Sequence, residues 1–129
     1  MWSIFNFRRE LIKKFLKKNY EIYVIAGDDN YNKQLIKIGC KTKVLNFNGR
    51  KFNIISEFLL FIKIILTFKK IKPDYVINFT IKPIIISGLV CRILKIKYIS
   101  VITGMGKIFT NNKNRSLLGE ILYKLTNLK

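Results

Sequence analysis

The spacing of hydrophobic residues in the first twenty positions predicts an amphipathic helix. Its apolar stripe consists of Phe7, Leu11, Ile12, Phe15 and Leu16. These residues recur at intervals of about three to four positions, the period of an α-helix. Arginines and lysines fill the positions between them, and Asn6 can cap the start. We therefore expect a basic helix with one apolar face.

The next part of the chain alternates between short β-branched runs and helical segments. Glu21–Ala26 and Lys41–Asn46 predict strands. Between them Tyr31–Ile38 has a helical pattern that Gly39 closes. A long apolar helix is expected from Asn53 to Lys70.

The most apolar part of that helix, Ile54 to Phe68, could be taken for a membrane span. It contains Glu57 and Lys63, and it is shorter than the roughly 18 to 20 residues that a bilayer requires. We expect a buried or interfacial helix instead.

The second half repeats the alternation after Pro73 stops the long helix. Asp74–Phe79 and Lys97–Ile102 predict strands, a helix runs from Pro83 to about Lys95, and Ser116–Leu128 is helical again. Such alternation predicts an α/β domain with a doubly wound parallel sheet, covered by helices on both faces. Folds of this kind usually start with a strand, whereas this chain starts on a helix.

The charge adds the expectation of an anionic partner. The 129 residues carry 25 Lys and Arg against seven Asp and Glu, a net charge of +18. Nucleic acid, an anionic membrane face and a phosphorylated ligand all fit such an excess. No zinc finger, RNA-recognition signature or helix-turn-helix spacing accompanies it, so nucleic-acid binding is suggested by charge alone and is kept only as an alternative.

The residues that could carry metal or nucleophile chemistry are few. Cys40 and Cys91 lie far apart, and the chain has no His. Zinc sites and Cys/His nucleophiles are therefore excluded, and buried thiols, no metal and no cofactor are expected. Asp28 and Asp29 are adjacent carboxylates in a turn; they could serve as a base or hold a metal, but capping the next helix is the better interpretation.

Three segments carry a resemblance to a known family. They are Trp2–Arg8 (WSIFNFR), Asn78–Pro83 (NFTIKP) and Ile102–Thr110 (ITGMGKIFT). In this order and spacing they resemble the N-terminal domain of bacterial family 4 glycosyltransferases, enzymes of the GT-B fold. The similarity is greatest to the subgroup that extends lipid-linked oligosaccharides for cell-surface glycans.

The resemblance implies that residues 1–129 form the acceptor-side, Rossmann-like half of a GT-B fold. In that family a C-terminal domain with paired glutamates holds most of the nucleotide sugar, and no such pair occurs here. The family's first strand, central in its sheet, is also missing. We therefore expect a domain truncated at both ends and inactive alone. A start further upstream, a decayed gene and a partner chain that supplies the missing parts remain open.

The resemblance also implies substrate-binding residues in the loops that line the cleft of the family. The backbone of Thr103, Gly104 and Gly106 would approach a diphosphate or acceptor sugar. Asn78 and Thr80 would bind sugar hydroxyls, and Lys82 a phosphate. Arg8 would make bidentate phosphate contacts. Ordinary structural roles stay open for each of them, and no catalytic residue is assigned.

The expected partners are a nucleotide sugar, a lipid-linked acceptor and an anionic membrane surface. Phe5, Phe7 and Phe15, within the lysine-rich first helix, fit an interfacial helix on anionic lipid; packing of that helix against the sheet is the alternative. We expect a cytoplasmic protein, peripheral on the inner face of the cell membrane. The alternative function is a basic, non-catalytic module that pairs with a partner subunit or binds nucleic acid.

Overall fold

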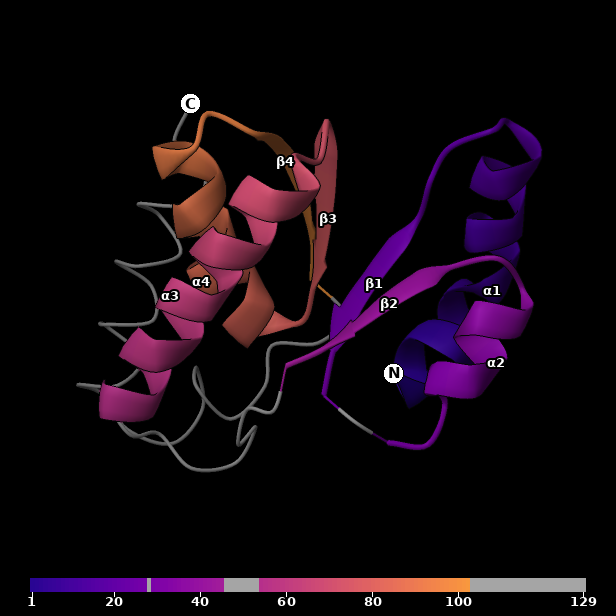
Figure 1. Ribbon diagram of the computed structural model, residues 1–129, viewed down its shortest axis with the longest axis horizontal. Helices are drawn as coiled ribbons and strands as arrows, with labels where there is room; N and C mark the ends of the chain where they lie inside the picture. Colours follow the sequence, from indigo (N-terminus) through magenta and orange to yellow (C-terminus); the bar gives the residue numbers. More distant parts are fainter. Residues whose placement is uncertain (28, 46–53, 103–129) are drawn as a thin grey trace. The chain divides into compact units, whose positions relative to one another are not determined.

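The computed structural model describes residues 1–27, 29–45 and 54–102 (Figure 1). Its elements are α1 (Trp2–Lys17), β1 (Tyr23–Ala26), α2 (Asn32–Lys37), β2 (Lys41–Val44), α3 (Ile54–Ile71), β3 (Tyr75–Phe79), α4 (Ile81–Ile93) and β4 (Lys97–Val101). Each helix and strand predicted within these ranges is present. The predicted helix Ser116–Leu128 lies outside the described residues.

The strands are paired in parallel, each pair joined through a helix. β1 pairs with β2 from Tyr23 opposite Lys41, and β3 pairs with β4 from Tyr75 opposite Lys97. The described strands thus make two separate two-stranded sheets. This mixed α/β architecture is that of a partial Rossmann-like half of a GT-B fold, as predicted.

The chain divides into two compact units, of which the first comprises Met1–Lys51. Its core cluster joins α1, β1 and α2 through five buried side chains: Met1, Ile12, Val24, Leu35 and Cys40. Leu35 of α2 and Val24 of β1 are both buried as members of this cluster. Burying an aliphatic side chain of this size stabilises the fold by about 1.5–3 kcal/mol.

The start of α1 differs from the prediction, whereas the end of α2 agrees with it. α1 begins at Trp2, five residues before Phe7, so the prediction that Asn6 caps its start is wrong. Asn6 lies within the helix, where its Nδ2 donates to the Trp2 carbonyl at 2.9 Å. α2 ends at Lys37, and Gly39 follows with a φ of +101°, a conformation that favours glycine.

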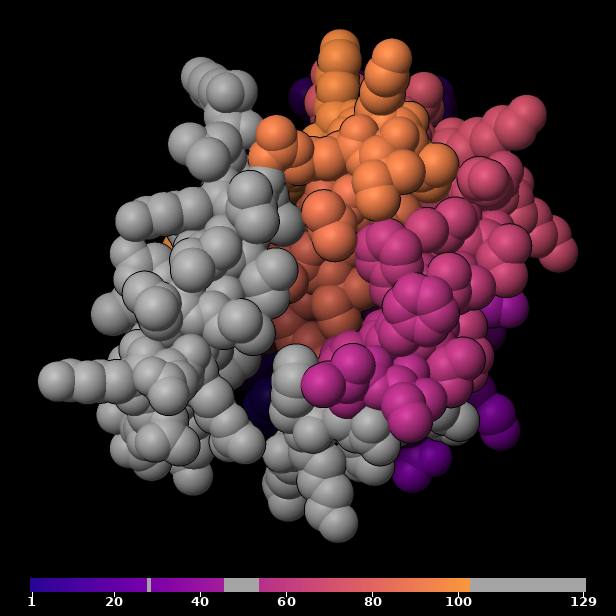
Figure 2. Space-filling view, turned by 90° about the vertical axis from the view of Figure 1, so that its left-hand side faces the viewer, coloured from indigo at the N-terminus to yellow at the C-terminus, as the bar shows by residue number. Residues whose placement is uncertain are grey.

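The second unit, within Phe52–Lys129, is built on α4. This helix contacts both β3 and β4, and α3 packs against α4 (Figure 1). Ile84, Val90 and Cys91 of α4 are completely buried. Figure 2 shows the outer face of this layer, where the magenta side chains of α3 adjoin the orange side chains of α4.

The two described helices of this unit agree with the sequence in type and differ slightly in extent. Leu60, Ile64 and Phe68 of α3 are buried at intervals of four residues. Within the described ranges, no helix is long and apolar enough to cross a membrane. α4 begins at Ile81, two residues before Pro83, because proline fits the first turn of a helix, where its missing N–H is not needed.

Candidate functional site

The turn from β3 to α4 contains three of the residues that the sequence suggested as substrate contacts. β3 ends at Phe79 and α4 begins at Ile81. Asn78 therefore lies at the end of the strand, Thr80 in the turn and Lys82 in the first turn of the helix. Ligands of parallel α/β sheets bind at this carboxyl edge of the strands, and the structure brings all three residues to it.

Asn78 is a polar side chain inside the layer between the sheet and α4. It is 4% exposed and is the ladder partner of Ser100, so both side chains project from the same face of the sheet. Tyr98 shares that face; burial raises the pKa of its phenol, and the charge of Arg92 on α4 opposes the rise. Among the described residues, the Asn78 Nδ2 and the hydroxyls of Ser87 and Ser100 find no hydrogen-bond partner.

An unpaired buried amide is energetically unfavourable. Leaving such a group without a partner costs about 1–3 kcal/mol. Buried polar atoms of this kind point to a bound water, a ligand or a functional role. As far as the described residues show, the Asn78 Nδ2 therefore has free hydrogen-bonding capacity at the carboxyl edge of β3.

Thr80 holds the turn in a strained backbone conformation. Its φ of 68° and ψ of 154° lie in a region that is occupied essentially by glycine, and such strain costs about 1–3 kcal/mol. The Thr80 side chain makes no capping hydrogen bond to the first turn of α4, so no cap compensates the strain. Strained turns of this kind cluster at ligand-binding sites.

Lys82 forms an ion pair that the sequence did not suggest. Its Nζ lies 2.5 Å from Oε1 of Glu57, and the two side chains are only 21% and 14% exposed. Glu57 lies in the first turn of α3. In the sequence, Glu57 was read as a charged residue that interrupts an apolar segment. A carboxylate near the start of a long apolar helix was the one sign in the sequence that pointed to it.

The N-terminus of α4 is suited to an anion. Its first turn contains no acidic residue. The Ile84 N–H donates to the Thr80 carbonyl at 3.1 Å, and Pro83 has no N–H. The first-turn N–H groups of Ile81 and Lys82 carry the positive end of the helix dipole. Together with the Lys82 ammonium they make a favourable environment for a phosphate or carboxylate.

A comparison with models of protein families shows to which family the chain belongs. A model of glycosyl transferase 4-like proteins matches residues 3–128, which includes the turn from β3 to α4. The chain belongs to the glycosyl transferase 4-like family. The match confirms the glycosyltransferase relationship inferred from the three motifs. No curated protein sequence matches the chain significantly.

The remaining candidate residues of this glycosyl transferase 4-like domain are not part of the turn from β3 to α4. Arg8 belongs to α1, in the first unit, where its side chain is partly buried and Nη1 donates to the Phe7 carbonyl at 3.1 Å. Thr103, Gly104 and Gly106 lie outside the described residues. A phosphate contact by any of these four stays a prediction.

Asp29 has a structural role, and its main partner differs from the predicted one. Its Oδ2 accepts hydrogen bonds from the backbone nitrogens of Met1 and Trp2, which form the N-terminus of α1. Its Oδ1 accepts a longer bond of 3.4 Å from the N–H of Tyr31, the N-cap residue of α2. Asp29 thus caps α1 more closely than the helix that follows it. Asp28 lies outside the described residues.

The pKa of Asp29 reflects this capping. Burial raises the pKa of the carboxyl, but the hydrogen bonds from Met1 and Trp2 outweigh burial and bring the pKa below its ordinary value. The ionised form is therefore favoured by the folded state. Asp29 also supplies the negative charge that the first turn of α1 itself lacks.

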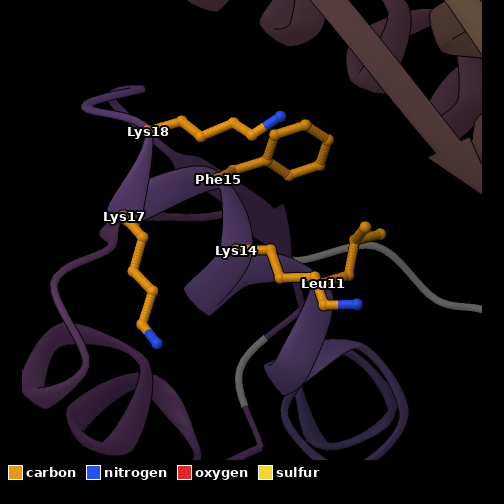
Figure 3. Close-up of a pocket in the computed structure, with 5 residues that line it drawn as sticks. All are labelled: Leu11, Lys14, Phe15, Lys17 and Lys18. Atoms are coloured by element: carbon orange, nitrogen blue, oxygen red, sulfur yellow. The ribbon is translucent and has the colours of Figure 1, made fainter.

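The exposed side of α1 carries a second group of apolar and basic side chains. We call it the outer stripe, and it consists of Phe7, Leu11, Lys14, Phe15 and Lys18. Phe7 is 64% exposed. Four of these residues, with Lys17, line a shallow cavity of about 410 Å³. In Figure 3 the Lys18 side chain extends along the ring of Phe15, whereas Lys17 points away from that ring.

The sequence suggested Phe5 as part of this surface, and the structure corrects that. Phe5 packs against the core cluster of the first unit, and its ring centroid lies 5.6 Å from that of Tyr31. Ile12 of α1 and Val24 of β1 share the core cluster, which favours the alternative that α1 packs against the sheet. Membrane contact by the outer stripe stays a prediction.

The cysteines are placed as expected. Cys40 and Cys91 are free and buried, and burial raises the pKa of the Cys91 thiol to about 11. A thiol with so high a pKa is a poor nucleophile at neutral pH. Within the described part of the chain no three His, Cys, Asp or Glu side chains gather as a metal site would require.

Proposed function

We propose that this glycosyl transferase 4-like domain is the acceptor-side half of a bacterial enzyme of cell-surface glycan synthesis. Its partner substrates would be a nucleotide-sugar donor and a lipid-linked or polysaccharide acceptor. The acceptor binds at the carboxyl edge of β3. The observation that supports this most is the turn from β3 to α4. There a buried amide nitrogen without a partner in the described part of the chain, a strained backbone and a helix N-terminus meet.

The chemistry of this edge suits a sugar attached to a diphosphate. The N–H groups at the start of α4 and the Lys82 ammonium favour the negative charge of a phosphate. Asn78 supplies amide hydrogens, the type of group that binds sugar hydroxyls or phosphate oxygens. The surrounding structure holds Thr80 in its strained conformation. The turn is thus formed before a ligand arrives, which lowers the conformational cost of binding.

Binding of a soluble acceptor analogue tests the site. We would titrate the 129-residue chain with a short-chain prenyl diphosphate sugar and follow the affinity by calorimetry and the Asn78 side-chain amide by NMR. We expect Lys82→Met to weaken binding about tenfold, roughly the value of one charge-assisted hydrogen bond. Lys95→Met, an exposed lysine just after the other end of α4, is the matched control. Equal losses in both variants would contradict the site.

Activity of the same purified chain tests the second part of the proposal. These 129 residues contain no glutamate pair of the donor-binding type, so the chain should bind acceptor without turning over a nucleotide sugar. Product analysis with a radiolabelled donor and the lipid-linked acceptor is the measurement. Detectable transfer would show that the donor site is present after all.

A second proposal concerns the outer stripe of α1, which we infer docks on the anionic inner face of the cell membrane. Exposed aromatic and aliphatic side chains flanked by lysines are the composition of an interfacial helix. Phe7 and Leu11 would enter the headgroup region, while Lys14 and Lys18 approach acidic lipid, each lysine contributing about 1 kcal/mol.

Vesicle binding distinguishes this docking from general basicity. The double variant Lys14→Glu, Lys18→Glu should lower partitioning onto phosphatidylglycerol vesicles at least tenfold, in line with about 1 kcal/mol per lysine. The double variant Lys33→Glu, Lys37→Glu makes the same charge change on exposed positions of α2 and should lower it much less. A salt-sensitive shift of nucleic acid without vesicle binding would instead favour the basic binding module.

A further inference from the structure

The ion pair between Glu57 and Lys82 differs from the surface pairs of the molecule. Its atoms are 2.5 Å apart and its side chains are 14% and 21% exposed. In the pair of Glu10 and Lys13, by contrast, the side chains are 72% and 45% exposed. Removing charges from water is costly, and a partly buried pair persists because each member satisfies the other. Lys82 is thus held by a carboxylate that water screens only weakly.

The position of the pair puts this carboxylate where an anionic ligand would bind. Lys82 lies in the first turn of α4, directly after the strained residue Thr80. Glu57 comes from another helix, α3, and reaches the Lys82 ammonium from there. The Glu57 carboxylate thus pairs with the Lys82 ammonium, the group that a phosphate oxygen at the N-terminus of α4 would bind. The Glu57 carboxylate therefore has the charge and the position that the phosphate of a bound ligand would have.

We propose that Glu57 is a specificity-determining residue, an internal counter-ion that only a multiply charged anion displaces from Lys82. The inference rests on the proposed function, since it assumes that Lys82 binds the phosphate of the acceptor. Its consequence is that the site selects a diphosphate or phosphate monoester and rejects anions of single charge such as acetate.

The selectivity follows from the exchange of one anion for another. A singly charged anion replaces the carboxylate with an equal charge and loses its own hydration, so it gains nothing. A diphosphate brings more charge and additional oxygens, which the N–H groups at the start of α4 can bind along with the ammonium. The displaced Glu57 regains water and remains in the first turn of α3, where the helix dipole stabilises a negative charge.

Calorimetric titration of the full chain with inorganic pyrophosphate and with acetate tests the role of Glu57. The wild type should bind pyrophosphate and not acetate. Glu57→Gln removes the competing charge and should bind pyrophosphate about tenfold tighter, the effect of 1.4 kcal/mol, and should also bind acetate. Glu57→Asp, with a shorter side chain, should bind pyrophosphate with intermediate affinity. Glu10→Gln removes a carboxylate from an exposed pair and is the control that should change nothing.

The outcomes separate this inference from the proposed function. Equal pyrophosphate affinity in the wild type and Glu57→Gln would overturn the counter-ion role while leaving the anion site intact. Weaker binding by Glu57→Gln would also overturn it, because Glu57 would then position Lys82. If neither protein binds pyrophosphate, both the anion site and the counter-ion role are wrong. Should Glu57→Gln fail to fold, as judged by circular dichroism, Glu57→Asp decides: affinity at or below the wild-type value overturns the role.

Discussion

The turns that follow β1 and β3 have the same place in the fold and opposite properties. After β1, both carboxylate oxygens of Asp29 accept hydrogen bonds, one from the N-terminus of α1 and the other from the N–H of Tyr31. After β3, the Asn78 Nδ2 has no hydrogen-bond partner among the described residues and Thr80 is strained. A turn whose polar groups are satisfied stabilises the fold. A strained turn with an unsatisfied polar group can instead form hydrogen bonds to a ligand.

The largest expected effect tests whether the two units are equally well packed despite their different turns. Leu35 in the first unit and Ile84 in the second are both fully buried. Leu35→Ala and Ile84→Ala should each lower the free energy of unfolding by about 2–5 kcal/mol. Urea denaturation is the measurement. A loss below 1 kcal/mol in only one variant would mean that the corresponding core is loosely packed.

The next effect concerns Asp29 and the structural turn. Asp29→Ala should destabilise the chain by about 1–2 kcal/mol, since it removes a cap from α1. The pKa of this carboxyl is lowered in the folded state, so its stabilisation is present above the ordinary pKa and lost as pH falls through the lowered value. Denaturation midpoints of the two proteins should therefore differ at pH 7 and converge in acid, once the carboxyl is protonated in the folded state. A constant difference across that range would contradict the role of the charge.

Strain in the β3 turn predicts a stabilising change of about 1 kcal/mol. Thr80→Gly should raise the free energy of unfolding, because glycine adopts the conformation without strain, less a smaller entropic cost. Asn30→Gly is the control in the other turn. Asn30 also has a positive φ of 64°, but asparagine tolerates it, so the gain should be a few tenths of a kcal/mol. Equal gains would remove the distinction between the turns.

The smallest effect on stability is expected at Asn78. Asn78→Leu replaces a buried amide, whose Nδ2 has no partner among the described residues, by an apolar group of similar size. The free energy of unfolding should not fall by more than about 1 kcal/mol. Binding of the prenyl diphosphate sugar should nevertheless be lost. A large loss of stability, measured by thermal denaturation, would show that the Asn78 amide already has a structural partner such as a bound water.

The sequence predicted the fold well because its hydrophobic periods are strong. The intervals of four in α3 and the short apolar runs of the strands identify these elements without tertiary information. Element ends were less accurate. α1 begins at Trp2 because Asp29, distant in sequence, satisfies its first N–H groups, and no local pattern around Asn6 contains that fact.

The candidate site was predictable only in part. Asn78, Thr80 and Lys82 were identified from one motif, and they do lie together at the end of β3. The φ of Thr80 could not be predicted, since threonine by itself prefers extended conformations. Glu57 was missed because its importance depends on the packing of α3 against α4, which brings it to Lys82.

The two cysteines offer a way to observe each unit separately. Cys40 lies in the first unit and Cys91 in the second, both buried as free thiols. A buried thiol reacts with an alkylating reagent only when its surroundings open, so its labelling rate reports the local free energy of opening. Mass spectrometry of the native chain would time both events in one sample, without any substitution. The labelling rates of Cys40 and Cys91 would thus show how often each unit opens relative to the other.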